Sequence, residues 1–259
     1  MHDARRSNWL GLWTLYAREV RRFAKVWNQT LAAPVVTTLI FLAIFALALG
    51  GAVGTAGGVP FMEFLAPGLI TMAIAQNAFA NTSSSILIAK VQGNIVDTLM
   101  PPLNAHELTF GFAMGGVTRG VAVGVVVALA MAAFVPVRIH SPAAMAYFAV
   151  MASLMLSLLG VAAGIWSDKF DQMAAVTNFV ITPLSFLSGT FYVLDRLPAV
   201  FQHLAHLNPF FYMIDGFRYG VIGWSDVDPW LGAAVLAIVN ALLWALCHRM
   251  FAKGYKLKP

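Results

Sequence analysis

Two of the few charged residues of this chain, Asp215 and Arg218, stand three positions apart in the apolar stretch LNPFFYMIDGFRYGVIG, residues 207 to 223. Side chains at positions i and i+3 share one face of a helix, so this carboxylate and this guanidinium can form an ion pair. Asn208 can cap a helix that begins at Pro209. The chemistry expected here is charge pairing at low dielectric, with Asp215 and Arg218 holding a short helix in place.

Arg119, in the stretch GGVTRGVAV, is the one charged residue in the apolar run from about residue 108 to residue 137. It stands about one-third of the way along that run. If the run crosses a membrane, a long side chain at this depth can still reach the lipid headgroups. Two interpretations stay open: a structural anchor or ion pair, and a direct role in transport, because charges inside membrane spans are often functional. Small residues around it predict close helix packing: Gly115, Gly116, Gly120 and Gly124.

The sequence offers no arrangement suited to catalysis. It has no G-x-x-x-x-G-K-[ST] phosphate loop, and no nucleophile or carboxylate constellation is visible. His203 and His206 are three residues apart, but no third metal ligand is near them, and the single Cys247 excludes an intramolecular disulfide. We therefore expect neither an enzyme nor a cofactor or metal bound by this chain.

Composition indicates the elements that must position these charges. Hydrophobic residues make up 60% of the 259 residues and charged residues only 10%, against about 25% charged in soluble domains. The charge-free windows are long enough for helices of about 20 residues, the length needed to cross a bilayer. The sequence predicts an all-α integral membrane protein with six spans, at residues 31–53, 61–88, 108–137, 141–167, 171–194 and 229–250.

The basic residues predict the orientation of these spans. Twelve of those in loops and tails fall on the side of the two termini, and three fall on the other side: Arg138, Arg196 and Arg218. Because basic residues concentrate in cytoplasmic segments, both termini are expected in the cytoplasm. The positive charge then reflects topology and contact with anionic lipids, and no nucleic-acid partner is expected.

Residues 7–28 carry a helical period of aromatic and apolar residues: Trp9, Leu12, Trp13, Tyr16, Val20, Phe23 and Trp27. The opposite side of that helix is basic, with Arg18, Arg21, Arg22 and Lys25. This pattern predicts an amphipathic helix in the cytoplasmic interface, with its charges toward the lipid headgroups. The alternative is a helix that simply extends the first span.

The loop between the second and third predicted spans contains a short amphipathic segment over residues 93–101. Gly93 and Asn94 are helix start signals, and the pair Pro101-Pro102 stops a helix. Such a segment can dock a cytoplasmic partner, or it can be an inert turn; the local pattern favours neither.

Five blocks in a fixed order give the chain a family resemblance over almost its whole length. They are FMEFLAPGLITMAIAQNAFANTSSSI, GNIVDTLMPPLNAHE, GGVTRG, FVITPLSFLSGTFYVLDRLP and LNPFFYMIDGFRYGVIG. With these blocks the chain resembles the permease subunits of bacterial ABC exporters of the ABC-2 type, and among them the YadH-like inner-membrane permeases. Asp97 stands where glutamate is frequent in that family.

The resemblance implies an architecture and a set of partners. It implies six spans, an interfacial N-terminal helix, and two short re-entrant helices in the outer leaflet over residues 197–222. It also implies a coupling helix that docks on a cytoplasmic ATPase, with the residues Gly93, Asn94, Ile95, Asp97, Thr98, Leu99 and Pro101. Two permease copies in the bacterial inner membrane would then work with two ATPase copies, and ATP and magnesium would bind the ATPase.

The residues that could meet a substrate are uncharged polar and aromatic side chains in the second and fifth predicted spans. They are Gln76, Asn77, Phe79, Asn81, Asn178, Phe186, Phe191 and Tyr192. Such a mixture suits an amphipathic lipid-like or drug-like molecule. The polar members could equally form interhelical hydrogen bonds, each contributing about 0.6 kcal/mol, but the resemblance places these two spans along the central pathway.

The expected function is therefore that of a transmembrane permease subunit of an ATP-driven exporter. One alternative is a permease of the same fold that exports a lipid-linked glycan. Another is a proton-driven transporter or a channel, which would be expected to carry a membrane-embedded carboxylate or an internal inverted repeat. The interiors of the predicted spans contain no Asp or Glu.

Overall fold

The structure is a computed structural model that describes residues 8–56, 58–136, 139–194 and 198–257, without the side chains of residues 49–53. The first residues of the predicted interfacial helix and of the predicted re-entrant region, 7 and 197, lie outside these ranges. So do five basic residues that contribute to the predicted orientation: Arg5, Arg6, Arg138, Arg196 and Lys258.

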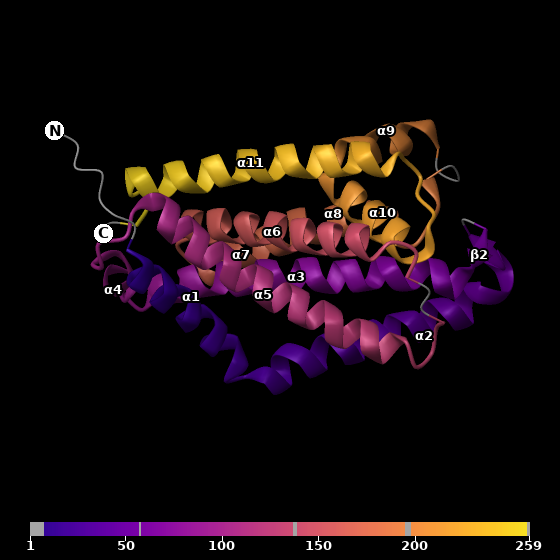
Figure 1. The fold of residues 1–259 in the computed structure, drawn as a ribbon, viewed down its shortest axis with the longest axis horizontal. Coiled ribbons are helices and arrows are strands. Elements are labelled where there is room, and N and C mark those ends of the chain that lie inside the picture. Colours follow the sequence, from indigo (N-terminus) through magenta and orange to yellow (C-terminus); the bar gives the residue numbers. More distant parts are fainter. Residues whose placement is uncertain (1–7, 57, 137–138, 195–197, 258–259) are drawn as a thin grey trace.

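Long helices lying side by side form the body of the molecule (Figure 1). They are α3 (Phe61–Val91), α5 (Ala105–Met131), α6 (Pro142–Trp166) and α11 (Pro229–Lys253). A Cβ atom added to Gly120 of α5 would lie only 2.8 Å from the carbonyl oxygen of Ile74 in α3, so these two helices touch at the backbone. The predicted close packing is confirmed there, and equally short distances occur at its other members: Gly115, Gly116 and Gly124.

The N-terminal part of the chain flanks this body. It comprises α1 (Trp9–Ala24), the π-helical turn η1 (Asn28–Ala32), α2 (Ala33–Val53) and a hairpin of β1 (Thr55–Ala56) and β2 (Val59–Pro60). The start of α1, the short helix α4 (Ile95–Leu99) and the end of α11 lie at one end of the molecule, and the hairpin lies at the other (Figure 1). Both ends of the described chain are thus on one side, which an even number of crossings requires.

Four helical segments of the described residues are long and apolar enough to cross a bilayer: Asn28–Ala48, Ala105–Met131, Pro142–Trp166 and Pro229–Lys253. They correspond to four of the six predicted spans. Helix α3 has the length, with 31 residues, but polar residues in its middle lower its mean hydropathy: Gln76, Asn77 and Asn81. Crossing by α3 therefore stays a prediction.

The fifth predicted span is not one continuous helix. It consists of α7 (Phe170–Val176), the π-helical turn η2 (Thr177–Ile181) and α8 (Thr182–Phe186), so the helical run ends at residue 186 and not at 194. Pro183 has no backbone N–H to continue the helical ladder, and the π-helical turn lies directly before the helix that contains it. The helix ends where Leu187 leaves the helical conformation (φ −80°, ψ 16°), two residues before Gly189 with its left-handed φ of 72°. The predicted end at residue 194 is therefore wrong.

The predicted re-entrant region forms two helices, α9 (Ala199–Leu207) and α10 (Pro209–Ile222). The predicted cap is confirmed, because the Asn208 side chain accepts a hydrogen bond of 3.0 Å from the backbone N–H of Phe210. Helix α9 exposes apolar side chains, with Leu207 at 81%, whereas α10 is almost wholly buried against α3, α6 and α11. The two helices thus differ: α9 is a surface helix and α10 is part of the core.

Candidate functional site

Two basic residues of α1, Arg18 and Arg22, lie beside a buried acid of the same helix. Trp9 and Trp13 are 73% and 64% exposed, whereas Glu19 is fully buried. The Glu19 carboxylate lies 3.2 Å from Nη2 of Arg18 and 3.4 Å from Nη2 of Arg22. The predicted orientation toward lipid headgroups is therefore wrong for Arg18 and Arg22, because a buried carboxylate needs cations beside it. For Arg21 and Lys25, which are exposed, it stays a prediction.

Arg22 joins α1 to α3. Its guanidinium donates to Oγ of Ser84 at 3.1 Å and to Oδ1 of Asn81 at 3.0 Å. Ser85 of the same helix donates to Oε1 of Glu19 at 2.8 Å. Asn81 thus makes an interhelical hydrogen bond, which is the structural alternative that the sequence left open for it.

The predicted coupling segment is a single helical turn, α4, with one exposed side. Asp97 is exposed between Val96 and Met100, which are 46% and 75% exposed. Of the predicted coupling residues, Ile95 and Thr98 are buried, Leu99 is half-buried, and the rest are exposed: Gly93, Asn94, Asp97 and Pro101. The outer side of this turn offers a carboxylate between apolar side chains.

The α4 loop is fastened to α1. Nη1 of Arg18 donates to Oγ1 of Thr98 at 2.8 Å. Beyond the turn, the Glu107 carboxylate accepts from the backbone N–H of Asn8 and of Asn104, both at 2.8 Å, and so ties the start of α1 to the capping box of α5. Helix α1 therefore connects the exposed turn of α4 to α3.

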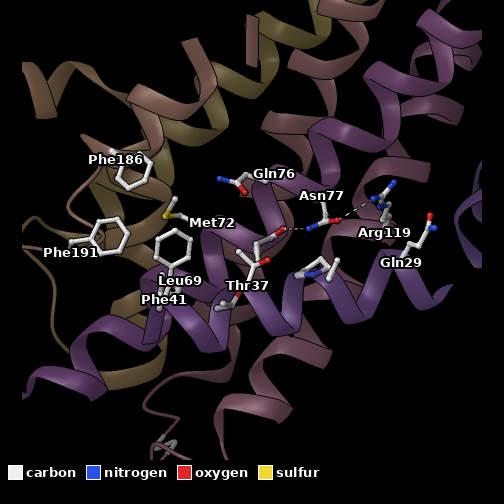
Figure 2. Close-up of a pocket in the computed structure, with 14 residues that line it drawn as sticks. Gln29, Thr37, Phe41, Leu69, Met72, Gln76, Asn77, Arg119, Phe186 and Phe191 are labelled. Atoms are coloured by element: carbon white, nitrogen blue, oxygen red, sulfur yellow. Dashed lines mark hydrogen bonds between the residues drawn. The ribbon is translucent and has the colours of Figure 1, made fainter. Parts of the chain in front are cut away.

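A cavity of about 420 Å³ lies between α2, α3, α5 and the chain around α8. Figure 2 shows two different ends: Arg119 and Gln29 at one, Phe186 and Phe191 at the other. Phe191 stacks on Phe186 and on Phe45, with ring centroids 5.5 Å and 4.5 Å apart. The cavity opens to the surface, because Gln29 and Phe186 are exposed. It is lined by Gln29, Ala33, Pro34, Thr37, Thr38, Phe41, Leu69, Met72, Ala73, Gln76, Asn77, Arg119, Phe186 and Phe191.

A second cavity of about 410 Å³ shares Gln76 with the first and extends along α3 past Phe79 and Ser84 to Phe170. The structure thus brings most of the predicted substrate-pathway residues to these two cavities: Gln76, Asn77, Phe79, Phe186 and Phe191. Three others line neither cavity: Asn81, Asn178 and Tyr192. Asn178 is exposed, and Tyr192 is half-buried. Gln29 and Thr37 also line the first cavity, and no local sequence signal distinguished them.

Arg119 lies at the middle of α5, fourteen residues after Ala105 and twelve before Met131. This is about 20 Å from either end of the helix at 1.5 Å per residue, and the expected depth of one-third into a membrane stays a prediction. The helix starts earlier than predicted because Asn104 and Glu107 form its capping box, and it ends six residues earlier. Nη2 of Arg119 donates to Oδ1 of Asn77 at 3.2 Å. Within the described residues it forms no ion pair with a carboxylate.

Arg218 is compensated by its surroundings. Its side chain is fully buried, and its Nη1 lies 3.9 Å from a carboxylate oxygen of Asp215, so the predicted pair is confirmed. A second carboxylate, that of Asp226, lies equally close. Nη2 donates to the carbonyl oxygen of Gly189 at 2.7 Å, and the guanidinium carbon lies 3.9 Å from the ring centroid of Phe64.

Asp226 and Phe64 were missed by sequence reasoning. Asp226 lies in the loop after α10, and its backbone N–H donates to Oδ1 of Asp215 at 2.8 Å. The cluster of acids in WSDVD was the available signal, because a loop that immediately follows a helix can fold back on it. No local signal pointed to Phe64, which belongs to α3.

Asp168, between α6 and α7, holds two lysines at the same end of the molecule as α4. Its carboxylate accepts from Nζ of Lys256 at 2.7 Å and from Nζ of Lys90 at 3.1 Å. The hydrogen bonds from Lys256 and then Lys90 lower the pKa of the Asp168 carboxyl. The C-terminal segment is thereby fixed beside the loop that leads to α4.

Comparison with known proteins agrees with this architecture. Residues 11–222 match the family model described as ABC-2 type transporter. The chain is 38% identical to the inner membrane transport permease YadH of Escherichia coli (strain K12) over 250 residues, 96% of this chain and 98% of that protein. It is also 26% identical to nodulation protein J of Rhizobium leguminosarum bv. trifolii over 235 residues, 90% and 88% of the two chains. The resemblance expected from the sequence is thus confirmed, and the chain belongs to the ABC-2 type transporter family.

Proposed function

We propose that this chain is the permease subunit of an ATP-driven exporter, which moves an amphipathic molecule out of the cytoplasm or the inner leaflet. Two copies cross the bacterial inner membrane, each with six spans and cytoplasmic termini. They act with two copies of a separate ABC ATPase, which binds ATP and magnesium. The family membership supports this proposal, as does the similarity to the Escherichia coli inner membrane transport permease.

One observation supports the coupling to an ATPase most strongly: hydrogen bonds and ion pairs link the exposed turn of α4 to α3, which forms part of the cavity wall. Thr98 bonds Arg18, which pairs with Glu19; Glu19 pairs with Arg22, and Arg22 bonds Asn81 of α3. Asn77 stands four residues before Asn81 on the same side of α3, and it lines the cavity. A displacement of α4 by an ATPase would therefore reach the cavity wall through α1.

The cavity favours export of a small amphiphile. Its volume of about 420 Å³ lies within the range of about 300–1,000 Å³ typical of small-molecule sites. A proton-driven mechanism has less support, because none of the described residues that line the two cavities is an Asp or a Glu.

The proposal is tested by purifying the permease with a candidate ABC ATPase in lipid nanodiscs and measuring ATP hydrolysis. We expect Asp97→Lys to abolish retention of the ATPase, because loss of a buried interfacial charge pair costs about 2–5 kcal/mol. Asp171→Lys, a charge reversal at another exposed aspartate, is the matched control and should retain the complex. Full retention and stimulation by Asp97→Lys would overturn the assignment of α4 as the coupling helix.

A further inference from the structure

We propose that the cavity between α2, α3 and α5 binds an anionic amphiphile, with its acidic headgroup at Arg119 and its apolar part at Phe186 and Phe191. This inference rests on the proposed function and adds the substrate class to it. The ligand carries a carboxylate, phosphate or sulfate at one end and a single apolar chain or ring system at the other.

The charge of Arg119 is the first argument. The guanidinium stands at mid-helix and is half-buried, and its one side-chain partner among the described residues is the neutral amide of Asn77. Within the same residues no carboxylate pairs with it. Charges inside membrane proteins are normally paired or face a water-filled cavity, so the structure leaves Arg119 able to take an anion as its partner.

The composition of the cavity wall is the second argument. Among the described residues that form the wall, Arg119 is the one that carries a charge, and it has the amides of Gln29, Gln76 and Asn77 as polar companions. These side chains donate hydrogen bonds to oxyanions, and a guanidinium can bind a carboxylate or phosphate through two parallel hydrogen bonds. None of these described wall residues has an acidic side chain that could bind a cation.

The separation of the two ends is the third argument. Figure 2 places Arg119 and Gln29 far from Phe186 and Phe191, with Met72, Leu69 and Phe41 between them. Gln76, Asn77 and Thr37 lie between these apolar side chains and Arg119 (Figure 2). A ligand that fills the cavity therefore meets a charge and polar groups toward one end and apolar side chains at the other. The exposed Gln29 and Phe186 show that both ends are open to the surface, so a flexible chain can enter from the side.

The ligand chemistry has two possible sources, a transported molecule or the headgroup of an anionic phospholipid. The probe is 11-(dansylamino)undecanoic acid, whose fluorescence rises in an apolar site, and its uncharged methyl ester is the matched control ligand. Binding is measured to the purified permease in phosphatidylcholine nanodiscs and in nanodiscs that also contain phosphatidylglycerol.

We expect the permease to bind the acid more tightly than the ester. Arg119→Gln should weaken binding of the acid at least about tenfold, the loss expected for one charge-assisted hydrogen bond, and leave the ester within about twofold. Arg119→Lys should restore part of the affinity. Arg21→Gln, which removes an exposed arginine of α1, should bind the acid as the wild type does.

Two further measurements distinguish a transported molecule from a phospholipid headgroup. If phosphatidylglycerol displaces the acid, Arg119 binds a lipid headgroup; if the acid binds equally in both nanodiscs and raises ATP hydrolysis by the complex, it occupies the site as cargo. Equal affinities of acid and ester, or an Arg119→Gln variant that binds the acid normally, would overturn the inference. These binding measurements need no ATPase, so a failure to form the complex would refute the proposed function separately.

Discussion

Arg218 and Arg119 are both arginines in helices of a chain with few charges, yet their surroundings are opposite. Arg218 is enclosed by two carboxylates, a backbone carbonyl and the ring of Phe64. Arg119 has one neutral amide beside it and opens into a cavity. A charge compensated from within the chain stabilises the fold, whereas a charge without a counter-ion remains available for an external anion.

The same distinction orders the other charged clusters by burial. Glu19 is fully buried, but its partner arginines are partly exposed to solvent. Asp168 and its two lysines lie at the surface. Because water compensates exposed charges, the effect of removing one member should fall from Arg218 through Glu19 to Asp168.

The largest effect is expected for Arg218→Ala. It leaves Asp215 buried without the cation of its pair, and breaking such a buried pair costs about 3–5 kcal/mol. Thermal unfolding of the detergent-purified variant measures this loss, with Arg21→Ala as the control for an exposed arginine. An Arg218→Ala variant as stable as the wild type would show that this cluster is not a structural element.

The second carboxylate changes what a double variant should do. From the sequence alone, replacing both Asp215 and Arg218 is expected to restore part of what either single change loses. With Asp226 equally close to Arg218, the double variant still buries that acid without the arginine. The double variant should therefore recover less than the sequence alone suggests, and the same unfolding assay compares it with a triple variant that adds Asp226→Asn.

Glu19→Gln should have an intermediate effect. It removes the carboxylate between Arg18 and Arg22, whose side chains are 47% and 33% exposed and so keep part of their hydration. The expected loss of stability is about 1–3 kcal/mol, the cost of an unsatisfied buried polar group, together with weaker stimulation of the ATPase. A loss as large as that of Arg218→Ala would contradict the ordering by burial.

Asp168→Asn should have the smallest effect and act locally, by releasing the C-terminal segment. A spin label on Tyr255→Cys reports this, because Cys247 is buried and should not react.

The pH dependence of the same contact follows from its charges. The pKa of Asp168 is lowered by its lysines, so the stabilisation that this carboxylate gives the C-terminal segment is complete above the ordinary carboxyl pKa of about 3.9. It is lost only as the pH falls through the lower, folded-state value. Label mobility should therefore be constant from about pH 5 to pH 8 in the chain that retains Asp168, and it should be higher in the Asp168→Asn variant at every pH in that window. A change in mobility within this window in the chain that retains Asp168 would contradict this account.

Local signals were enough to predict where several helices begin. Helices α6, α10 and α11 all start at a proline that follows a capping side chain, namely Ser141, Asn208 and Asp228. Capping and the fixed φ of proline act within a few residues. The start of α10 was predicted from this signal, and the starts of α6 and α11 were predicted to within about a residue from the ends of charge-free windows.

Tertiary contacts decided the features that the sequence did not reveal. The helical period of α1 does not indicate which of its residues contact the protein. Glu19, which places Arg18 and Arg22, is held by a hydrogen bond from Ser85, 66 residues away. The pairing of Asp215 with Arg218 was predictable because it is local. The approach of Asp226 and Phe64 was not, because it depends on how a loop and α3 pack on α10.

The most direct test of the contrast between the two arginines compares thermal unfolding of Arg218→Gln and Arg119→Gln in one detergent, without added ligand. The account predicts that Arg218→Gln lowers Tm by roughly 6 °C or more. Arg119→Gln should unfold close to the wild-type Tm, because it leaves no carboxylate without a partner in the described residues. An equal loss of Tm in the two variants would contradict the account, since Arg119 would then be compensated within the chain as Arg218 is.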